Sequence, residues 1–308
     1  MQLPGTNVPQ PSAPLSISPK STQGIQRPRI ICYHQTHFNN STFVSLLPLL
    51  TQKTAVTHVI LAAIHLNQPA GNITINDDPW DSPKHSPLWS EVRALQSAGI
   101  YVMGMLGGAA QGSFTALDGD LSSFNAFYMP LRHMIETTNL NGLDLDVEEE
   151  MSLGGIIRLI DRLHADFGPS FIITLAPVAT ALQNRRNLSG FDYEVLEKGL
   201  GHKISWYNTQ FYCGWGSLVS TTDYERILSR GWPPNKVIVG LVTNPANGQG
   251  WVGDDVLRKT LRTLLERYPD FGGVMGWEYF NSITETSPAV GRPWCWAQLM
   301  TEILKQGS

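Results

Sequence analysis

The chain has 308 residues, of which 42% are hydrophobic and 16% are charged, and its formal net charge is −4. This length suits a single α/β barrel, and the apolar fraction is enough for a large buried core. The small negative charge, without a long basic run, argues against a nucleic-acid-binding surface and against a polybasic membrane patch. We therefore expect a neutral substrate.

The N-terminal residues 1–28 are rich in Pro, Ser and Gln and are predicted to form a disordered tail. They lack the basic start and the continuous apolar stretch of a secretory signal, and no segment has the length and apolarity of a membrane span. For the chain as written we expect a cytoplasmic location, with secretion as the alternative if the N-terminus is incomplete. The three cysteines, Cys32, Cys213 and Cys295, show no disulfide or zinc spacing.

Eight short β-branched or apolar runs follow the tail, and amphipathic helical patterns separate them. The predicted strands are Arg29–Tyr33, His58–Leu66, Tyr101–Gly107, Gly142–Glu148, Phe171–Ala176, Trp206–Tyr212, Val237–Val242 and Gly273–Trp277. Helices are predicted from Ser86 to Gly99, from Ile156 to Phe167, from Leu257 to Tyr268 and from Trp296 to Leu304. Alternating units of this kind predict one α/β domain, a single (β/α)8 TIM barrel over residues 29–308, with a doubly wound open sheet as the alternative.

The most informative stretch is the predicted strand Gly142–Glu148, in which Asp144, Asp146 and Glu148 alternate with aliphatic residues. Side chains alternate between the faces of a strand, so the three acids face the barrel interior. Burying three acids in a row is costly, which favours a catalytic role over a structural one. Glu148 is nearest the carboxyl end of the strand, where barrel active sites lie. Such a row titrates as a coupled set that holds at least one proton.

A metal site is the alternative explanation of these acids, but no further set of ligands is evident. His34 and His37, with Cys32 nearby, give only a weak metal pattern and are interpreted as ordinary polar residues at a strand end. Gly107 and Gly108 lack the context of a phosphate-binding loop and are interpreted as making room for a loop beside a ligand. We expect no metal and no other cofactor.

The segment Asn141 to Glu148 resembles the Asp-Gly-x-Asp-x-Asp-x-Glu signature of glycoside hydrolase family 18, with Asn in the first position. Three further segments resemble family motifs in the same order: Met105 to Gly108, Gln210 to Tyr212, and Gly273 to Trp277. The resemblance extends from Arg29 to the C-terminus and is closest to fungal endo-β-N-acetylglucosaminidases of the Endo T type. Glu149 and Glu150 depart from the pattern, and we expect both on the rim of the site or in a loop.

The resemblance implies substrate-assisted, retaining catalysis on a β-linked N-acetylglucosamine. It implies Glu148 as the acid/base, Asp146 and Asp144 as its supporting acids, and Tyr212 as a hydrogen-bond donor to the substrate acetamide. Residues predicted to bind the sugar are Gln210, Trp277, Asn208, Tyr33, Gly107 and Gly108. The expected ligand is an N-glycan or a chitooligosaccharide, and we expect a monomer that binds neither nucleic acid nor membrane.

Three functions remain open from the sequence. The first is cleavage of the GlcNAc-β-1,4-GlcNAc linkage in the chitobiose core of N-glycans. The second is a chitinase that uses the same residues on chitin or its oligomers. The third is a catalytically weak sugar-binding lectin on the same fold, which the presence of Glu148, Asp146 and Tyr212 makes the least favoured.

Overall fold

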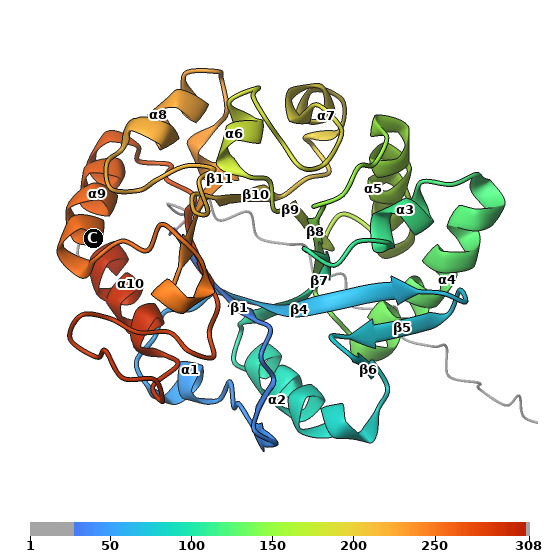
Figure 1. Cartoon of the computed structure of the whole chain (residues 1–308), viewed down its shortest axis with the longest axis horizontal. Helices are drawn as coiled ribbons and strands as arrows, with labels where there is room; N and C mark the ends of the chain where they lie inside the picture. Colours follow the sequence, from blue (N-terminus) through green and yellow to red (C-terminus); the bar gives the residue numbers. More distant parts are fainter. Residues whose placement is uncertain (1–27, 306–308) are drawn as a thin grey trace, which may run out of the picture.

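The computed structural model describes residues 28–305, so the predicted disordered tail lies outside the described residues except for Pro28. Eight parallel strands circle the centre of the molecule in Figure 1. They are β1 (Arg29–His34), β4 (His58–Asn67), β7 (Tyr101–Gly107), β8 (Gly142–Asp146), β9 (Ile172–Leu175), β10 (Trp206–Gln210), β11 (Val237–Val242) and β12 (Gly273–Trp277). The first strand pairs with both β12 and β4, which closes the barrel. The predicted (β/α)8 barrel is therefore confirmed, and the open sheet is excluded.

Helices surround the barrel on its outside, as Figure 1 shows. They are α1 (Pro48–Thr51), α2 (Ser86–Ser97), α3 (Ser113–Leu117), α4 (Leu121–Thr138), α5 (Leu153–Phe167), α6 (Ala179–Leu182), α7 (Tyr193–Leu200), α8 (Thr222–Leu228), α9 (Asp254–Arg267) and α10 (Cys295–Lys305). The four helices expected from the sequence correspond to α2, α5, α9 and α10. Within residues 28–305, no helix is both long enough and apolar enough to span a bilayer.

Four short strands were not expected from the sequence. Two of them extend the sheet next to the end of β4. Strand β5 (Asn72–Ile75) pairs antiparallel with the end of β4, and β6 (Asp78–Pro79) pairs with β5. Strands β2 (Phe38–Asn39) and β3 (Thr42–Phe43) form a small hairpin after β1. All four lie in the segments that follow β1 and β4, so they build the surroundings of the barrel mouth on that side.

The apolar core has two parts, and the barrel wall separates them. The larger part lies between the strands and the helices, where α5 contributes Ile156, Leu159, Ile160 and Leu163, all fully buried. The smaller part fills the barrel interior with side chains such as Ile31, Ile60, Met103, Ile238 and Met275. Truncating a buried Leu or Ile to Ala costs about 2–5 kcal/mol. This packed interior holds the strand ends, and the side chains on them, in fixed positions.

Candidate active site

The acid row lies on β8 and on the residues that follow it. Asp144 and Asp146 are buried inside the barrel, and Glu148 lies just beyond the end of the strand and is partly exposed. The intervening Leu143 and Leu145 pack in the core between strands and helices. The alternation of the strand therefore directs the acids inward, and the acid nearest the barrel mouth is the one that solvent can reach.

Asp144 is the deepest of the three acids, and three side chains from other strands donate hydrogen bonds to it. The Tyr33 hydroxyl lies 2.6 Å from one carboxylate oxygen, while the Thr174 hydroxyl and the Asn208 amide lie 2.5 Å and 2.9 Å from the other. Complete burial raises the pKa of Asp144, and the three donors oppose that shift by stabilising the charged form. Asp144 is thus held in one orientation beneath the other acids.

The Gln210 amide links the two upper acids. Its nitrogen lies 3.2 Å from an oxygen of Asp146, 3.2 Å from an oxygen of Glu148 and 3.0 Å from the Ala176 carbonyl oxygen. Burial, followed by the negative charges of Glu148 and Asp144, raises the pKa of Asp146 well above its usual range. The protonated form of Asp146 is therefore favoured, in a carboxyl group that the Gln210 amide contacts.

Two aromatic side chains complete the centre of the site. Tyr212 follows β10, lines the cleft and is almost completely buried. Burial, and then the negative charges of Asp146 and Glu148, raise the pKa of its hydroxyl well above the usual value. The hydroxyl therefore keeps its proton and is available as a donor. Trp277, the last residue of β12, also lines the cleft and packs edge-on against Tyr33 with ring centroids 5.7 Å apart.

The paired glycines after β7 allow the backbone to pass close to the acid strand. Both have positive φ, near +90°, and the Gly108 amide donates to the Asp146 carbonyl oxygen at 2.9 Å. A Cβ at Gly107 would lie 2.3 Å from a ring carbon of Phe114 and 2.6 Å from the Asp146 carbonyl oxygen. Glycine is required at Gly107 for both its conformation and its surroundings.

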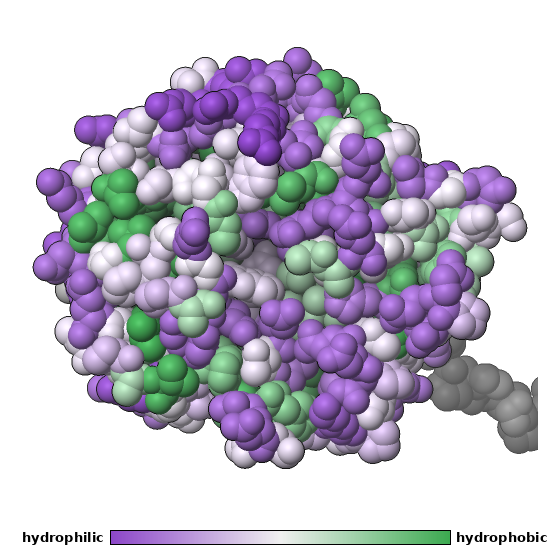
Figure 2. Space-filling model, viewed as in Figure 1, coloured by the Kyte–Doolittle hydropathy of each residue, from purple (hydrophilic) through white to green (hydrophobic). Residues whose placement is uncertain are grey.

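These residues surround a cleft of about 500 Å³ at the carboxyl ends of the strands. A hollow near the middle of the barrel face is visible in Figure 2. Of the residues predicted from the sequence, those that line the cleft are Asp146, Glu148, Gln210, Tyr212, Trp277, Gly107 and Gly108.

Asn208 and Tyr33 were expected to contact the sugar, but the structure places both beneath the cleft. Asn208 is fully buried, and its two polar atoms are used, one as a donor to Asp144 and the other as an acceptor from the Trp206 indole. The Tyr33 hydroxyl is directed at Asp144 as well. We therefore assign these two residues to positioning Asp144, because a side chain that only protein atoms surround has no room for a sugar.

Several lining residues were not predicted: most lie on loops with no periodic pattern, and one, His65, lies near the end of β4. They are Gln35, His65, Leu188, Cys213, Trp215 and Asn247. The indole of Trp215 lies under the Arg186 guanidinium, whose carbon is 5.6 Å from the ring centroid. The only feature of the sequence that could have indicated Trp215 as a site residue is its position between Gly214 and Gly216, soon after β10.

Glu149 lies in the loop after β8, which is one of the two positions expected for it, but its side chain is buried. Its carboxylate accepts hydrogen bonds from the backbone amides of Gly112 and Phe114 and from the Thr115 hydroxyl, at 2.6 to 3.0 Å. It therefore anchors the first turn of α3. Glu150 is exposed, as expected.

Metal binding has no support in the described residues 28–305, where no cluster of three or more His, Cys, Asp and Glu side chains has a metal-binding arrangement. His34 and His37 lie side by side, with ring centroids 4.8 Å apart, and are buried. Burial lowers the pKa of both rings, so they are neutral near pH 7. They pack beneath the loop that follows β1.

Comparison with known proteins shows the family to which the chain belongs. The model of the glycosyl hydrolases family 18 matches residues 29–298. A structure of chitinase ChiC from Aspergillus fumigatus is 55% identical, covers 90% of this chain and 99% of its own, and superposes with a TM-score of 0.83. A fungal endo-β-N-acetylglucosaminidase of family 18 is 49% identical, covers 91% and 99%, and has a TM-score of 0.87.

Among curated proteins, Chitinase 2 of Rhizopus oligosporus is 25% identical over 211 residues, which are 61% of this chain and 36% of that protein. The match thus spans about a third of the length of that chitinase. The family model, in contrast, covers nearly all of the barrel described above, including the acid row. The chain belongs to glycoside hydrolase family 18.

Proposed function

We propose that this protein is an endo-β-N-acetylglucosaminidase that cleaves the GlcNAc-β-1,4-GlcNAc linkage in the chitobiose core of N-glycans. The observation that carries hydrolysis of a β-linked N-acetylglucosamine is the acid row at the barrel mouth, where Gln210 bridges Glu148 and Asp146, whose pKa is raised. The 49% identity to a fungal endo-β-N-acetylglucosaminidase supports this substrate. The cleft is also large enough to enclose a reacting sugar.

In the proposed reaction the substrate supplies its own nucleophile. Glu148 protonates the oxygen of the bond that breaks, while the acetamide oxygen of the sugar on the non-reducing side attacks the anomeric carbon. An oxazolinium ion forms and the leaving sugar departs. Glu148 then takes a proton from water, which opens the ring at the same carbon, so the configuration is retained. A partly exposed carboxyl beside the cleft can exchange its proton in both steps.

The remaining residues orient the acetamide. Asp146 orients the acetamide N–H group, and the negative charge of the three acids, which share one proton, stabilises the positive charge that develops on the ring. Asp144, held by its three donors, is the inner partner of that proton. Tyr212 donates a hydrogen bond to the acetamide oxygen and so sets its angle of attack. Trp277 forms the floor under the reacting sugar.

A chitinase is the second candidate, and the 55% identity to ChiC of Aspergillus fumigatus favours it. The catalytic residues do not separate the two activities, since both need the same acetamide chemistry. The difference lies in what binds on either side of the reacting sugar. Product analysis therefore decides between them.

The test is to incubate the full chain and a Glu148→Gln variant with a high-mannose glycoprotein and with chitin oligosaccharides, and to identify products by mass spectrometry. The wild type should leave one N-acetylglucosamine on the protein, and the variant should be about 100- to 10,000-fold slower. Cleavage of chitin oligomers alone would make the protein a chitinase. Oligosaccharide binding without any product would make it a lectin.

A further inference from the structure

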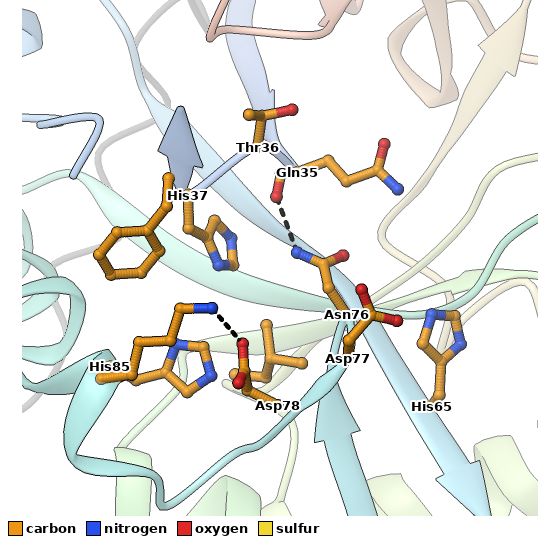
Figure 3. Close-up of a pocket in the computed structure, with 11 residues that line it drawn as sticks. Gln35, Thr36, His37, His65, Asn76, Asp77, Asp78 and His85 are labelled. Carbon is orange, nitrogen blue, oxygen red and sulfur yellow. Dashed lines mark hydrogen bonds and ion pairs between the residues drawn. The ribbon is translucent and has the colours of Figure 1, made fainter. Parts of the chain in front are cut away.

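A second cavity, of about 400 Å³, opens beside the catalytic cleft. It lies between the loop after β1 and the strands β5 and β6, as Figure 3 shows. Gln35 and His65 line both the cleft and this cavity, which we call the side pocket. The side pocket and the cleft are therefore neighbours, and Gln35 and His65 lie at their junction.

The side pocket is fixed relative to the floor of the cleft. The residue after Trp277 is Glu278. Its carboxylate accepts hydrogen bonds from the backbone amides of Gln35 and Thr36, at 3.0 and 2.8 Å, and from the Thr36 hydroxyl, at 2.7 Å. Asn76 ties the other wall to the same loop, because its amide donates to the Gln35 carbonyl oxygen at 2.8 Å. The side pocket thus adjoins the part of the cleft that Trp277 lines.

The lining of the side pocket does not favour stacking of sugar rings. Among the described residues that line it, none is a tryptophan or a tyrosine. The ring of Phe38 is occupied, since the Lys84 ammonium lies 5.1 Å from its centroid and Phe43 packs 5.5 Å away. The cleft, in contrast, offers Trp215, Trp277 and Tyr212. The side pocket must therefore hold a ligand mainly by hydrogen bonds.

Several hydrogen-bonding groups are available for that purpose. In Figure 3 the dashed lines join Asn76 to the Gln35 backbone and Lys84 to Asp78. The side chains of Asp77, His65 and Gln35 have no such line to another residue drawn. Burial lowers the pKa of His65, and the negative charge of Asp77 is close enough to oppose that shift. A carboxylate has two acceptor oxygens and can bind two neighbouring hydroxyl groups at once.

We propose that the side pocket binds a neutral hexose that carries free vicinal hydroxyls and no acetamide, such as a mannose on the non-reducing side of an N-glycan core. This inference rests on the proposed function. Asp77 accepts a pair of hydroxyls, while Gln35 and His65 contact the same sugar at the junction with the cleft. An N-acetylglucosamine suits the pocket less well, because its mostly polar lining gives the acetamide methyl little apolar contact. An acidic sugar is disfavoured by the uncompensated Asp77.

The test measures binding to the full chain carrying Glu148→Gln, so that no ligand is cleaved. Isothermal titration calorimetry compares a high-mannose oligosaccharide that keeps its two core N-acetylglucosamines with a chitin tetramer. Asp77→Asn is added to this background, and Asp81→Asn serves as the matched control, since Asp81 is an exposed acid nearby that does not line the pocket. Asp77 is also exposed, so its substitution should not prevent folding.

We expect Asp77→Asn to weaken binding of the high-mannose ligand about tenfold or more, because a charge-assisted pair of hydrogen bonds is lost. Binding of the chitin tetramer should be unchanged, and Asp81→Asn should change neither. Equal weakening of both ligands, or no weakening of the high-mannose ligand, would overturn the inference. Failure of the proposed function is read separately, as the absence of glycan release from a high-mannose glycopeptide by the wild type.

Discussion

The chemistry of this site depends on single residues that hold the three acids Asp144, Asp146 and Glu148 close together. Gln210 is central, because one amide group contacts Asp146, Glu148 and the backbone of β9's extension at Ala176. Its hydrogen bond lowers the pKa of Asp146 and so offsets part of the effect of burial. The same amide keeps the two upper carboxyl groups within reach of one ligand. It is therefore both an electrostatic and a geometric element of the site.

Replacing Gln210 with Leu should raise the pKa of Asp146 further, since the charged form loses a donor. The acidic limb of the pH profile of kcat/KM should then move to higher pH, and the maximum rate should fall about ten- to hundredfold. Rate measurements across pH on a chitooligosaccharide or glycopeptide test this. Gln183→Leu is the control, because Gln183 is equally buried but bonds the Asp223 backbone away from the cleft. An unshifted profile in Gln210→Leu would refute this role.

Among the elements, the short helix α3 depends on a charge supplied by a different segment. Glu149 follows the catalytic acid directly, yet its carboxylate binds the start of α3 and so holds the loop after Gly108 against the acid strand. Negative charge at a helix N-terminus is favourable because unpaired amides point toward it. This interaction explains why a second acid is tolerated beside Glu148.

Replacing Glu149 with Gln should destabilise the fold by about 2 kcal/mol, because charge-assisted bonds become neutral and an amide N–H is brought toward backbone N–H groups. Urea unfolding measures the change in the free energy of unfolding. Glu150→Gln, at an exposed position, should change stability by less than about 0.5 kcal/mol. Equal stability of the two variants would mean that the bonds to α3 contribute nothing net.

Helices and strands could be predicted from the sequence where the hydrophobic pattern was strong. The prediction failed where a residue such as proline argued against that pattern. All eight barrel strands were located, with ends within two residues of those observed, because apolar runs bounded by turns are distinctive. Helix α4 was not predicted although Phe124, Phe127 and Leu131 follow a helical period, since Pro130 lies inside it and proline disfavours helix interiors. The two-residue strands β2, β3 and β6 are too short to leave a pattern.

For the molecule as a whole, the centre of the site could be predicted and its margins could not. Asp144 and Asp146 share β8 and Glu148 follows it two residues after Asp146, so spacing alone places the three together. Partners such as Tyr33 and Thr174 lie far away in sequence, and only barrel closure brings them to Asp144. The side pocket has no sequence signature at all, because loops from two different strands form it. Predicting it would have required the antiparallel pairing of β5 with β4.

The buried histidines predict that the free energy of unfolding of the whole protein falls in acid. Burial, and then the nearby charge of Arg29, lowers the pKa of His58 to about 3, against an ordinary value of 6.5. Since the unfolded chain binds a proton below pH 6.5 and the folded protein does not, stability is fully present above pH 6.5 and is lost as the pH falls toward 3. Each pH unit in that window costs about 1.4 kcal/mol. Asp146 acts in the opposite sense, because a raised pKa in the fold favours the folded state at low pH.

Replacing His58 with Phe should therefore reduce the loss of unfolding free energy between pH 7 and pH 5 by about 2 kcal/mol. Phenylalanine keeps the contact with the rings of Tyr101 and Trp206, whose centroids lie 5.2 and 4.9 Å from that of His58, and cannot be protonated. Urea unfolding at the two pH values provides the measurement, with His202→Phe as a control at an exposed position. If the wild type and His58→Phe lost stability equally, another group would have to account for the acid sensitivity of the barrel, and the buried His34 and His37 would be the next to replace.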